Sequence, residues 1–416
     1  MTAPAGSRSV LRRLTGFTVL PLLSLVTPFL LMPVVARVAG PPGWSSFVAG
    51  QAVGTVGATV VFWGWNVGGP VLVAQASTAA ERAEVYVASL RTRYLLLVGV
   101  LPAAALVSAL VAQPGHRVDA AAMAVATALL GMSPSWFGIG VGDPWLLFWY
   151  DTLPRVVAAC LGAAVVWATG LVWTYPVLLA LSVVVSLMAF RRRVAGPSVG
   201  GGSLFPVSRS AGELRSHLGT AGINLAATAY ASTPVPVVTV AFRPEVSSPF
   251  ASADAAYRLG LFSVTAMGNA FQGWTLETGL DGGERRSRHR SAFLAHMVLG
   301  VVGGGLFAAL GPWVTGFVFG ADVAAPRNVC VWYGLAFLFL SASTPPIRNL
   351  LVPAGRVRLV LGWTVGSAAV GLASMVAAAL AGWSAGVAAG MAVSEAVLLA
   401  GLLGPALHAA RTARTP

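Results

Sequence analysis

Residues 91–112 read RTRYLLLVGVLPAAALVSALVA, in which two arginines precede nineteen residues without a charge. A helix rises about 1.5 Å per residue, so about 20 apolar residues cross the roughly 30 Å hydrocarbon layer of a bilayer. The apolar run is continuous rather than alternating, which favours a helix over a strand of a β-barrel. This stretch therefore predicts a membrane-spanning helix that begins beside a pair of arginines.

Comparable stretches recur along the chain and predict an all-α polytopic membrane protein. The chain is 56% hydrophobic and 9% charged, which leaves too little polar surface to cover a soluble globule of 416 residues. About twelve transmembrane helices are expected. They cover residues 17–38, 45–72, 94–112, 119–139, 145–167, 171–190, 217–241, 251–275, 292–318, 329–350, 357–380 and 384–407.

All 26 basic residues are arginines, and they collect in alternate connections between the predicted spans. Short connections rich in arginine stay on the cytoplasmic side of a membrane. Both termini are therefore expected in the cytoplasm. Twenty arginines then lie in cytoplasmic segments: Arg8, Arg12, Arg13, Arg82, Arg91, Arg93, Arg191, Arg192, Arg193, Arg209, Arg215, Arg285, Arg286, Arg288, Arg290, Arg348, Arg356, Arg358, Arg411 and Arg414. Four lie outside: Arg37, Arg117, Arg243 and Arg327.

The remaining composition excludes several classes of function. The net charge of +13 is mostly this arginine set, which faces anionic lipid headgroups, so no nucleic-acid partner is expected. Cys160 and Cys330 fall in apolar stretches without metal-ligand spacing and are expected to be small buried side chains. The chain shows no acid pair, nucleophile elbow, phosphate-binding loop or zinc spacing. We expect neither an enzyme nor a bound metal or cofactor.

A repeat divides the chain into two halves. Thr27-Pro28 precedes Arg37 in the first predicted span, and Thr233-Pro234 precedes Arg243 at the same interval in the seventh. The arginine-rich and glycine-rich segment 191–215 lies near the midpoint and is typical of a flexible cytoplasmic linker. We therefore expect a six-helix half over 1–190, a linker over 191–215, and a second six-helix half over 216–416. Two halves of the same orientation imply a pseudo-two-fold axis along the membrane normal.

Three segments resemble one family of transporters. Pro134-Ser135-Trp136-Phe137, followed by Gly138, Gly140 and Gly142, resembles the Pro-x-Trp-Phe-x-x-Gly stretch of O-antigen and capsule oligosaccharide flippases. The exit from the tenth span, with Asn349, Ala354, Gly355 and Arg356, is similar to the family's Asn-x-x-x-x-Ala-x-Gly-Arg connection, and the close of the first helix at Arg37-Val38-Ala39-Gly40 resembles its Arg-x-x-Gly-like turn. These flippases belong to the multidrug/oligosaccharidyl-lipid/polysaccharide (MOP) exporter superfamily.

The resemblance implies a MATE-like, MOP flippase fold and a specific cargo. Such a protein would move a polyprenyl-pyrophosphate-linked oligosaccharide across the bacterial plasma membrane, as a monomeric transport unit surrounded by membrane lipids. A diphosphate and a glycan cannot cross hydrocarbon unaided, because each desolvated charge costs several kcal/mol or more. A cationic cavity between the halves, opened to each side in turn, would lower that cost. H⁺ or Na⁺ is the expected coupling ion.

Two alternatives stay open. A cation-coupled multidrug or small-molecule exporter of the same superfamily would share the spans and the duplication, but it should have a more apolar or acidic cavity. A membrane-bound glycan polymerase or ligase belongs to a different class and usually needs a long outer loop. The outer connections of this chain are predicted to be short.

Arginines that fall in or beside the spans are the candidate substrate-binding residues. Arg258 lies a turn into the eighth span, where it either binds phosphate or extends to the interface. Asp151 and Arg155 share a helix face and form either a gate or coupling-ion site or a self-compensating pair. Arg37 and Arg243 are either interface anchors or symmetry-related contacts that draw the pyrophosphate outward.

Three uncharged or acidic residues complete the candidate set. Glu395 lies in the middle of the twelfth span, where a lone carboxylate is either a proton or cation site or a hydrogen-bonded structural acid. Asn224 and Gln272 are candidates for hydrogen bonds to glycan hydroxyls, although contacts between helices are the commoner role of such amides.

Overall fold

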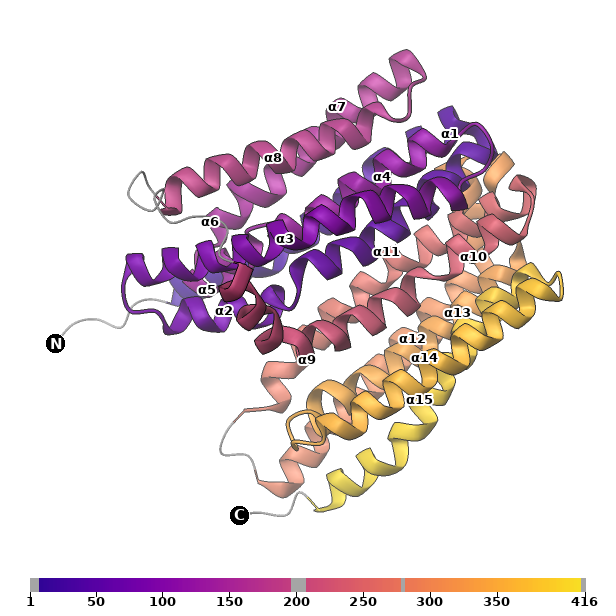
Figure 1. Cartoon of the computed structure of the whole chain (residues 1–416). Coiled ribbons are helices and arrows are strands. Elements are labelled where there is room, and N and C mark those ends of the chain that lie inside the picture. Colours follow the sequence, from indigo (N-terminus) through magenta and orange to yellow (C-terminus); the bar gives the residue numbers. More distant parts are fainter. Residues whose placement is uncertain (1–6, 196–206, 278–280, 413–416) are drawn as a thin grey trace. The chain divides into compact units, whose positions relative to one another are not determined.

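The computed structural model describes the backbone of residues 7–195, 207–277 and 281–412, and most side chains between Leu31 and Ala409. Every regular element within these ranges is a helix (Figure 1). Residues 196–206 of the predicted linker lie outside the described residues, as do these side chains named above: Arg8, Arg12, Arg13, Thr27, Pro28, Arg209, Arg411 and Arg414.

The chain forms two compact units, Met1–Ser232 and Thr233–Pro416. The first unit contains α1 (Ser7–Phe62), α2 (Trp65–Gln75), α3 (Ala79–Val111), α4 (Arg117–Leu129), η1 (Leu130–Met132), α5 (Ser135–Val141), α6 (Pro144–Leu147), η2 (Phe148–Thr152), α7 (Leu153–Thr169), α8 (Thr174–Ala195) and α9 (Val207–Ser232). The second contains α10 (Pro234–Ala241), α11 (Pro244–Thr275), α12 (Gly282–Phe319), η4 (Ala321–Val323), α13 (Arg327–Pro345), η5 (Pro346–Leu351), α14 (Val357–Leu380) and α15 (Ser384–Thr412). Helix α9 groups with the first unit, and the division predicted at 191–215 stays a prediction.

Helix α1 holds the first predicted span and most of the second, joined across a kink; the second span continues into α2. Gly40 adopts φ 64°, in the left-handed region that glycine enters without a Cβ clash. Pro41 and Pro42 follow it, and a proline suits the first turn of a new helix because its missing N–H would have no partner there. The Gly-Pro-Pro sequence therefore sets the end of the first span and the start of the second.

Two helices extend well beyond the spans predicted for them. Helix α3 begins at Ala79, where Thr78 and Glu81 form a capping box, and α12 begins at Gly282, where Asp281 caps the first turn. Their 33 and 38 residues correspond to about 50 and 57 Å, longer than the hydrocarbon layer. The predicted third span therefore began too late, because α3 already includes Arg91 and Arg93. Their placement on the cytoplasmic side stays a prediction.

Nine helical segments within the described residues are long and apolar enough to cross a membrane. Helix α11 is not among them, and it carries Glu245, Asp254 and Arg258. The prediction of an all-α polytopic membrane protein is confirmed. The order of helices is compatible with twelve spans in two halves, since α1 with α2 accounts for two of them and α9 with α10 occupies the place of the seventh.

Helices α12 and α13 of the second unit pack backbone against backbone. A Cβ atom on Gly304 would lie 2.4 Å from the carbonyl oxygen of Gly334, and one on Gly334 would lie 2.5 Å from that of Gly304. Gly305, the next residue, has nothing within 4 Å of its Cβ position. Small residues at such crossings let membrane helices approach closely, so Gly304 and Gly334 determine how near α12 and α13 lie.

Alanine at these neighbouring glycines should have opposite effects. We expect Gly304→Ala to lower the free energy of unfolding by about 1–3 kcal/mol, because its methyl group would push α12 and α13 apart. Gly305→Ala should leave stability unchanged or raise it by up to ~1 kcal/mol, because alanine is the better helix former. Thermal unfolding in one detergent, followed by tryptophan fluorescence, measures both. Equal midpoints for the two variants would contradict the close crossing.

Candidate functional site

Arg93 lies inside the first unit with its side chain fully buried. Its Nε donates to the carbonyl oxygen of Ser89 (3.2 Å) and its Nη2 to the Ser89 hydroxyl (2.9 Å). Its Nη1 reaches the carbonyl oxygens of Gly131 (3.3 Å) and Ser133 (3.1 Å). Helix α4 tightens into η1 and stops at this point, so these carbonyls have no partner within their own helix. Arg93 therefore supplies the hydrogen bonds that the broken helix lacks.

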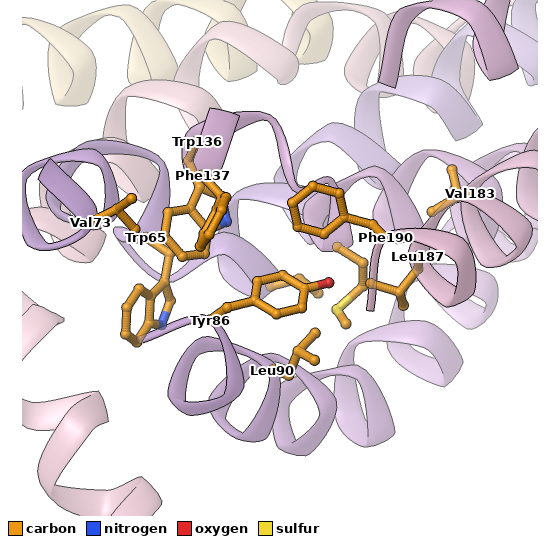
Figure 2. Close-up of a cluster of buried hydrophobic side chains, with 11 residues drawn as sticks. Trp65, Val73, Tyr86, Leu90, Trp136, Phe137, Val183, Leu187 and Phe190 are labelled. Atoms are coloured by element: carbon orange, nitrogen blue, oxygen red, sulfur yellow. The ribbon is translucent and has the colours of Figure 1, made fainter. Parts of the chain in front are cut away.

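An aromatic cluster surrounds this break (Figure 2). The guanidinium of Arg93 lies 5.7 Å from the centre of the Trp136 ring, within the range of a cation–π contact. Trp136 packs against Trp65 at 5.6 Å between ring centres, and Phe137 against Phe190 at 5.5 Å. The aromatic residues of the Pro-x-Trp-Phe segment are thus buried in the core of the first unit, which Arg93 and the aromatic rings hold together.

Asp151 and Arg155 form the ion pair expected from their spacing. The Nη2 of Arg155 lies 2.5 Å from Oδ1 of Asp151, and the hydroxyl of Ser133 donates to the same oxygen at 2.5 Å. Asp151 lies in the π-helical turn η2, and Arg155 in the first turn of α7. Both side chains are largely buried, with 11% and 20% exposure. The pair lines a small hollow with Ser182 and other residues of the first unit.

Ser133 connects the two arginines of the first unit. Its carbonyl oxygen accepts from Arg93, and its hydroxyl donates to Asp151, which in turn binds Arg155. One residue at a helix break thus binds a charged group on α3 and another on η2. A movement of the Ser133–Pro134 segment would disturb both groups, so this network couples the break to α7.

A second pair of the same spacing lies in the second unit. The Nε of Arg258 is 2.5 Å from Oδ2 of Asp254, and the hydroxyl of Tyr333 donates to Oδ1 of Asp254 at 2.9 Å. The Asp254 side chain is 1% exposed, whereas that of Arg258 is 31% exposed. Sequence reasoning singled out Arg258 but missed Asp254. The signal was available, because the two are four residues apart, as are Asp151 and Arg155.

Arg348 and Gln272 form a third polar cluster, also in the second unit. The Nη2 of Arg348, on η5, lies 2.8 Å from Oε1 of Gln272 and 2.8 Å from Oδ1 of Asn269, both on α11. Amides carry no net charge, and within the described part of the chain no carboxylate pairs with Arg348. Gln272 was predicted as a site residue, whereas Arg348 was assigned only to orienting the chain. Arg348 is partly exposed.

The other predicted site residues do not join these clusters. Arg37 is exposed and donates to the carbonyl oxygen of Pro33 (3.1 Å), and Arg243 is exposed just before α11. Asn224 is half-buried on α9, and its Nδ2 has no hydrogen-bond acceptor among the described residues. Glu395 is buried on α15 at 8% exposure, and its neighbour Ser394 donates to the carbonyl oxygen of Ser367 on α14. Their roles stay predictions.

Comparison by sequence finds no relative. No family model matches the chain, and no curated protein is similar to it in sequence. Similarity appears only between structures.

Several solved structures share the fold. The chain aligns with an inward-facing multidrug resistance MATE family transporter of the MOP superfamily at a TM-score of 0.61 and 12% identity, over 94% of this chain and 96% of that one. The chain has a MATE-like fold. The eukaryotic MATE transporter AtDTX14 aligns at 0.57 and 12% identity over 97% and 98% of the two chains. A MATE in complex with MaD5 aligns at 0.50 and 15% identity over 96% and 97%. At these identities the likeness concerns the fold.

Removing Arg93 from this MATE-like fold should destabilise the first unit. We expect Arg93→Met to lower the free energy of unfolding by about 2–5 kcal/mol, because the carbonyls of Gly131 and Ser133 would be buried without donors. Arg93→Lys should restore only part of the loss, since an ammonium lacks the guanidinium fork. Arg192→Gln, an exposed arginine of α8, is the control and should change stability by less than about 0.5 kcal/mol. Wild-type thermal stability in Arg93→Met would rule out this role.

The Asp254–Arg258 pair can be tested by a double-mutant cycle. Asp254→Asn or Arg258→Gln alone should lower the free energy of unfolding by about 3–5 kcal/mol, because each leaves the partner charge uncompensated. The double variant should lose clearly less than the sum of the two single losses. Thermal unfolding of the four proteins in one detergent gives the coupling energy. Additive losses would show that the pair does not act as a unit.

Proposed function

We propose that the chain is a flippase that moves a polyprenyl-pyrophosphate-linked oligosaccharide across the bacterial plasma membrane, for cell-surface polysaccharide biosynthesis. The observation that carries the proposal is Arg348. Its guanidinium is partly exposed and is positioned only by the neutral amides of Asn269 and Gln272 among the described residues. Such a group presents an uncompensated positive charge, held in a fixed orientation, to an anionic ligand. A guanidinium fork suits phosphate oxygens in particular.

The paired carboxylates favour an anionic cargo over a cationic one. Asp151 is bound by Arg155 and Ser133, and Asp254 by Arg258 and Tyr333. A site for an organic cation requires carboxylates that are free to bind it, whereas both of these are already neutralised. The charge that remains in these clusters is positive, which matches a pyrophosphate. The amides of Asn269 and Gln272 add the kind of hydrogen-bonding group that a glycan requires.

The MATE-like fold supports transport by alternating access, because an inward-facing transporter structure aligns along 94% of this chain. In the proposed mechanism the protein acts as a monomer that opens to each side of the membrane in turn. The polyprenyl chain stays in lipid while the pyrophosphate and glycan cross along a cationic path. Glu395 is the stronger candidate for coupling to H⁺ or Na⁺, because Asp151 already has a cationic partner. The arginine distribution favours a cytoplasmic position for both termini.

A cation-coupled small-molecule exporter is the second candidate. It is favoured by the fold of a multidrug resistance transporter and by the buried Glu395, which has no hydrogen-bonded partner among the described residues. In that case Glu395 would bind a proton or the transported cation in turn. The two candidates differ in the charge of the cargo, and a transport assay separates them.

Reconstituted protein should flip a pyrophosphate lipid through Arg348. Proteoliposomes would hold a short-chain polyprenyl-pyrophosphate disaccharide with a fluorescent label, and a membrane-impermeant quencher would report the outer leaflet. We expect Arg348→Gln to slow the initial rate by about tenfold or more, because a hydrogen bond to a charged group is lost. Arg358→Gln, which removes an exposed arginine at the start of α14, is the matched control.

The same vesicles should not transport ethidium under a H⁺ or Na⁺ gradient. Ethidium uptake that depends on Glu395, together with no movement of the labelled lipid, would replace the flippase by the exporter. Equal rates for Arg348→Gln and Arg358→Gln would remove Arg348 from the translocation path.

A further inference from the structure

A pocket of about 370 Å³ opens within the second unit, and its lining includes no residue of the three polar clusters. Its walls come from the beginning of α12, the junction of α13 with η5, and the last turns of α15. The volume falls in the range of small-ligand sites, which begin at roughly 300 Å³. The lining combines cationic side chains on α12 with apolar side chains from all three segments, so the pocket is amphipathic.

One stripe of α12 provides the cationic part. Arg286, His289, Arg290 and Phe293 line the pocket and follow the spacing of a single helix face. Both arginines are exposed, and within the described part of the chain neither pairs with a carboxylate. The stripe ends in Phe293, which is half-buried. Charge therefore lies at the start of the helix and apolar surface lies one to two turns further along it.

Arg288 lies on another face of α12 and, unlike Arg286 and Arg290, is held by carboxylates. It pairs with Glu284 at 2.7 Å and also with Glu277, and its guanidinium lies 5.1 Å from the centre of the Trp274 ring. The nearby carboxylates are thus bound by Arg288 and leave Arg286 and Arg290 free to meet another anion. The described lining of the pocket itself contains no carboxylate.

The remainder of the lining fits hydrocarbon. Leu350, Leu403 and Leu407 lie opposite the stripe, and Leu407 is 57% exposed despite its apolar side chain. No hydroxyl or amide side chain is among the described residues that line the pocket. A sugar would find hydrogen-bonding groups along the stripe but would leave the leucines uncovered, whereas an acyl chain would cover the leucines. The ligand that matches both parts has one anionic head and a hydrocarbon chain.

We propose that this pocket binds an anionic phospholipid from the cytoplasmic leaflet. Its phosphate contacts Arg286 and Arg290, and an acyl chain lies against Phe293, Leu403 and Leu407. The arginine-rich ends of the helices are predicted to face the cytoplasm, where negative surface potential concentrates anionic lipid at such groups. The bound lipid is a resident partner of the second unit rather than the transported cargo, so the proposal goes beyond the proposed function.

The test compares lipid binding by two variants of equal charge. Native mass spectrometry of the full-length, delipidated protein would follow titration with phosphatidylglycerol and with phosphatidylcholine of the same acyl chains. Arg286→Gln/Arg290→Gln removes the pocket arginines, whereas Arg285→Gln/Arg358→Gln removes two arginines that do not line it. We expect the first variant to bind phosphatidylglycerol about 10–30-fold more weakly than the wild type. The control variant should retain wild-type affinity, and all three proteins should unfold at the same temperature.

Three results would overturn the proposal. The first is equal affinity of the wild type for phosphatidylglycerol and phosphatidylcholine, and the second is an equal loss in both variants. The third is displacement of phosphatidylglycerol by soluble glycerol phosphate or, at equal concentration, by polyprenyl phosphate, since the pocket would then serve a free anion or the cargo lipid. The flipping assay uses neither variant, so its outcome and this one are independent.

Discussion

A helix that breaks within a membrane protein leaves carbonyl groups that lipid cannot satisfy, and in the first unit Arg93 supplies the missing donors. An unpartnered polar group in hydrocarbon costs several kcal/mol, so such a break is stable only where protein provides the hydrogen bonds. Arg93 binds the carbonyls of Gly131 and Ser133 and stacks over Trp136. With these contacts the chain can stop at η1 and restart at α5. The direction of α5, and the packing of its aromatic residues, follow from that restart.

The same requirement explains why Asp151 and Asp254 each have an arginine four residues later. An aspartate and an arginine on successive turns form their ion pair inside one helix, so neither charge depends on an approaching partner helix. Asp151 with Arg155 and Asp254 with Arg258 both follow this rule, and each aspartate also accepts a hydroxyl hydrogen bond, from Ser133 and Tyr333. Pairs built in this way are structurally self-sufficient. The charge left to act on a ligand is then carried by residues held by neutral groups, such as Arg348.

The sequence predicted the helical class because apolar runs of about twenty residues leave few other folds possible. It did not show where the helices begin or which arginines are buried. Arg93 was taken to mark the start of a span because an arginine beside an apolar run usually marks the membrane surface. In the structure α3 begins 14 residues before Arg93 and buries its side chain. The residues around Arg93 in the sequence include Ser89 but no nearby acid. Nothing in this stretch indicates that Arg93 would bind the carbonyl groups of Gly131 and Ser133. Contacts across about forty residues depend on packing, which no local pattern encodes.

The three arginines at 286, 288 and 290 differ in which face of α12 they occupy, although a count of charges at the membrane surface treats them alike. Residues 286 and 290 are four apart and share a face of α12, whereas residue 288 is turned about 200° from 286 and cannot share it. The two glutamates satisfy Arg288, and the other two arginines border an apolar pocket. The rule that arginine stays in the cytoplasm predicts the same side of the membrane for all three, but it assigns no partner to any of them. Once Asp281 is known to cap α12, the sequence itself gives the phase. Arginines near the ends of membrane helices are therefore informative about ligands only after their helical faces are assigned.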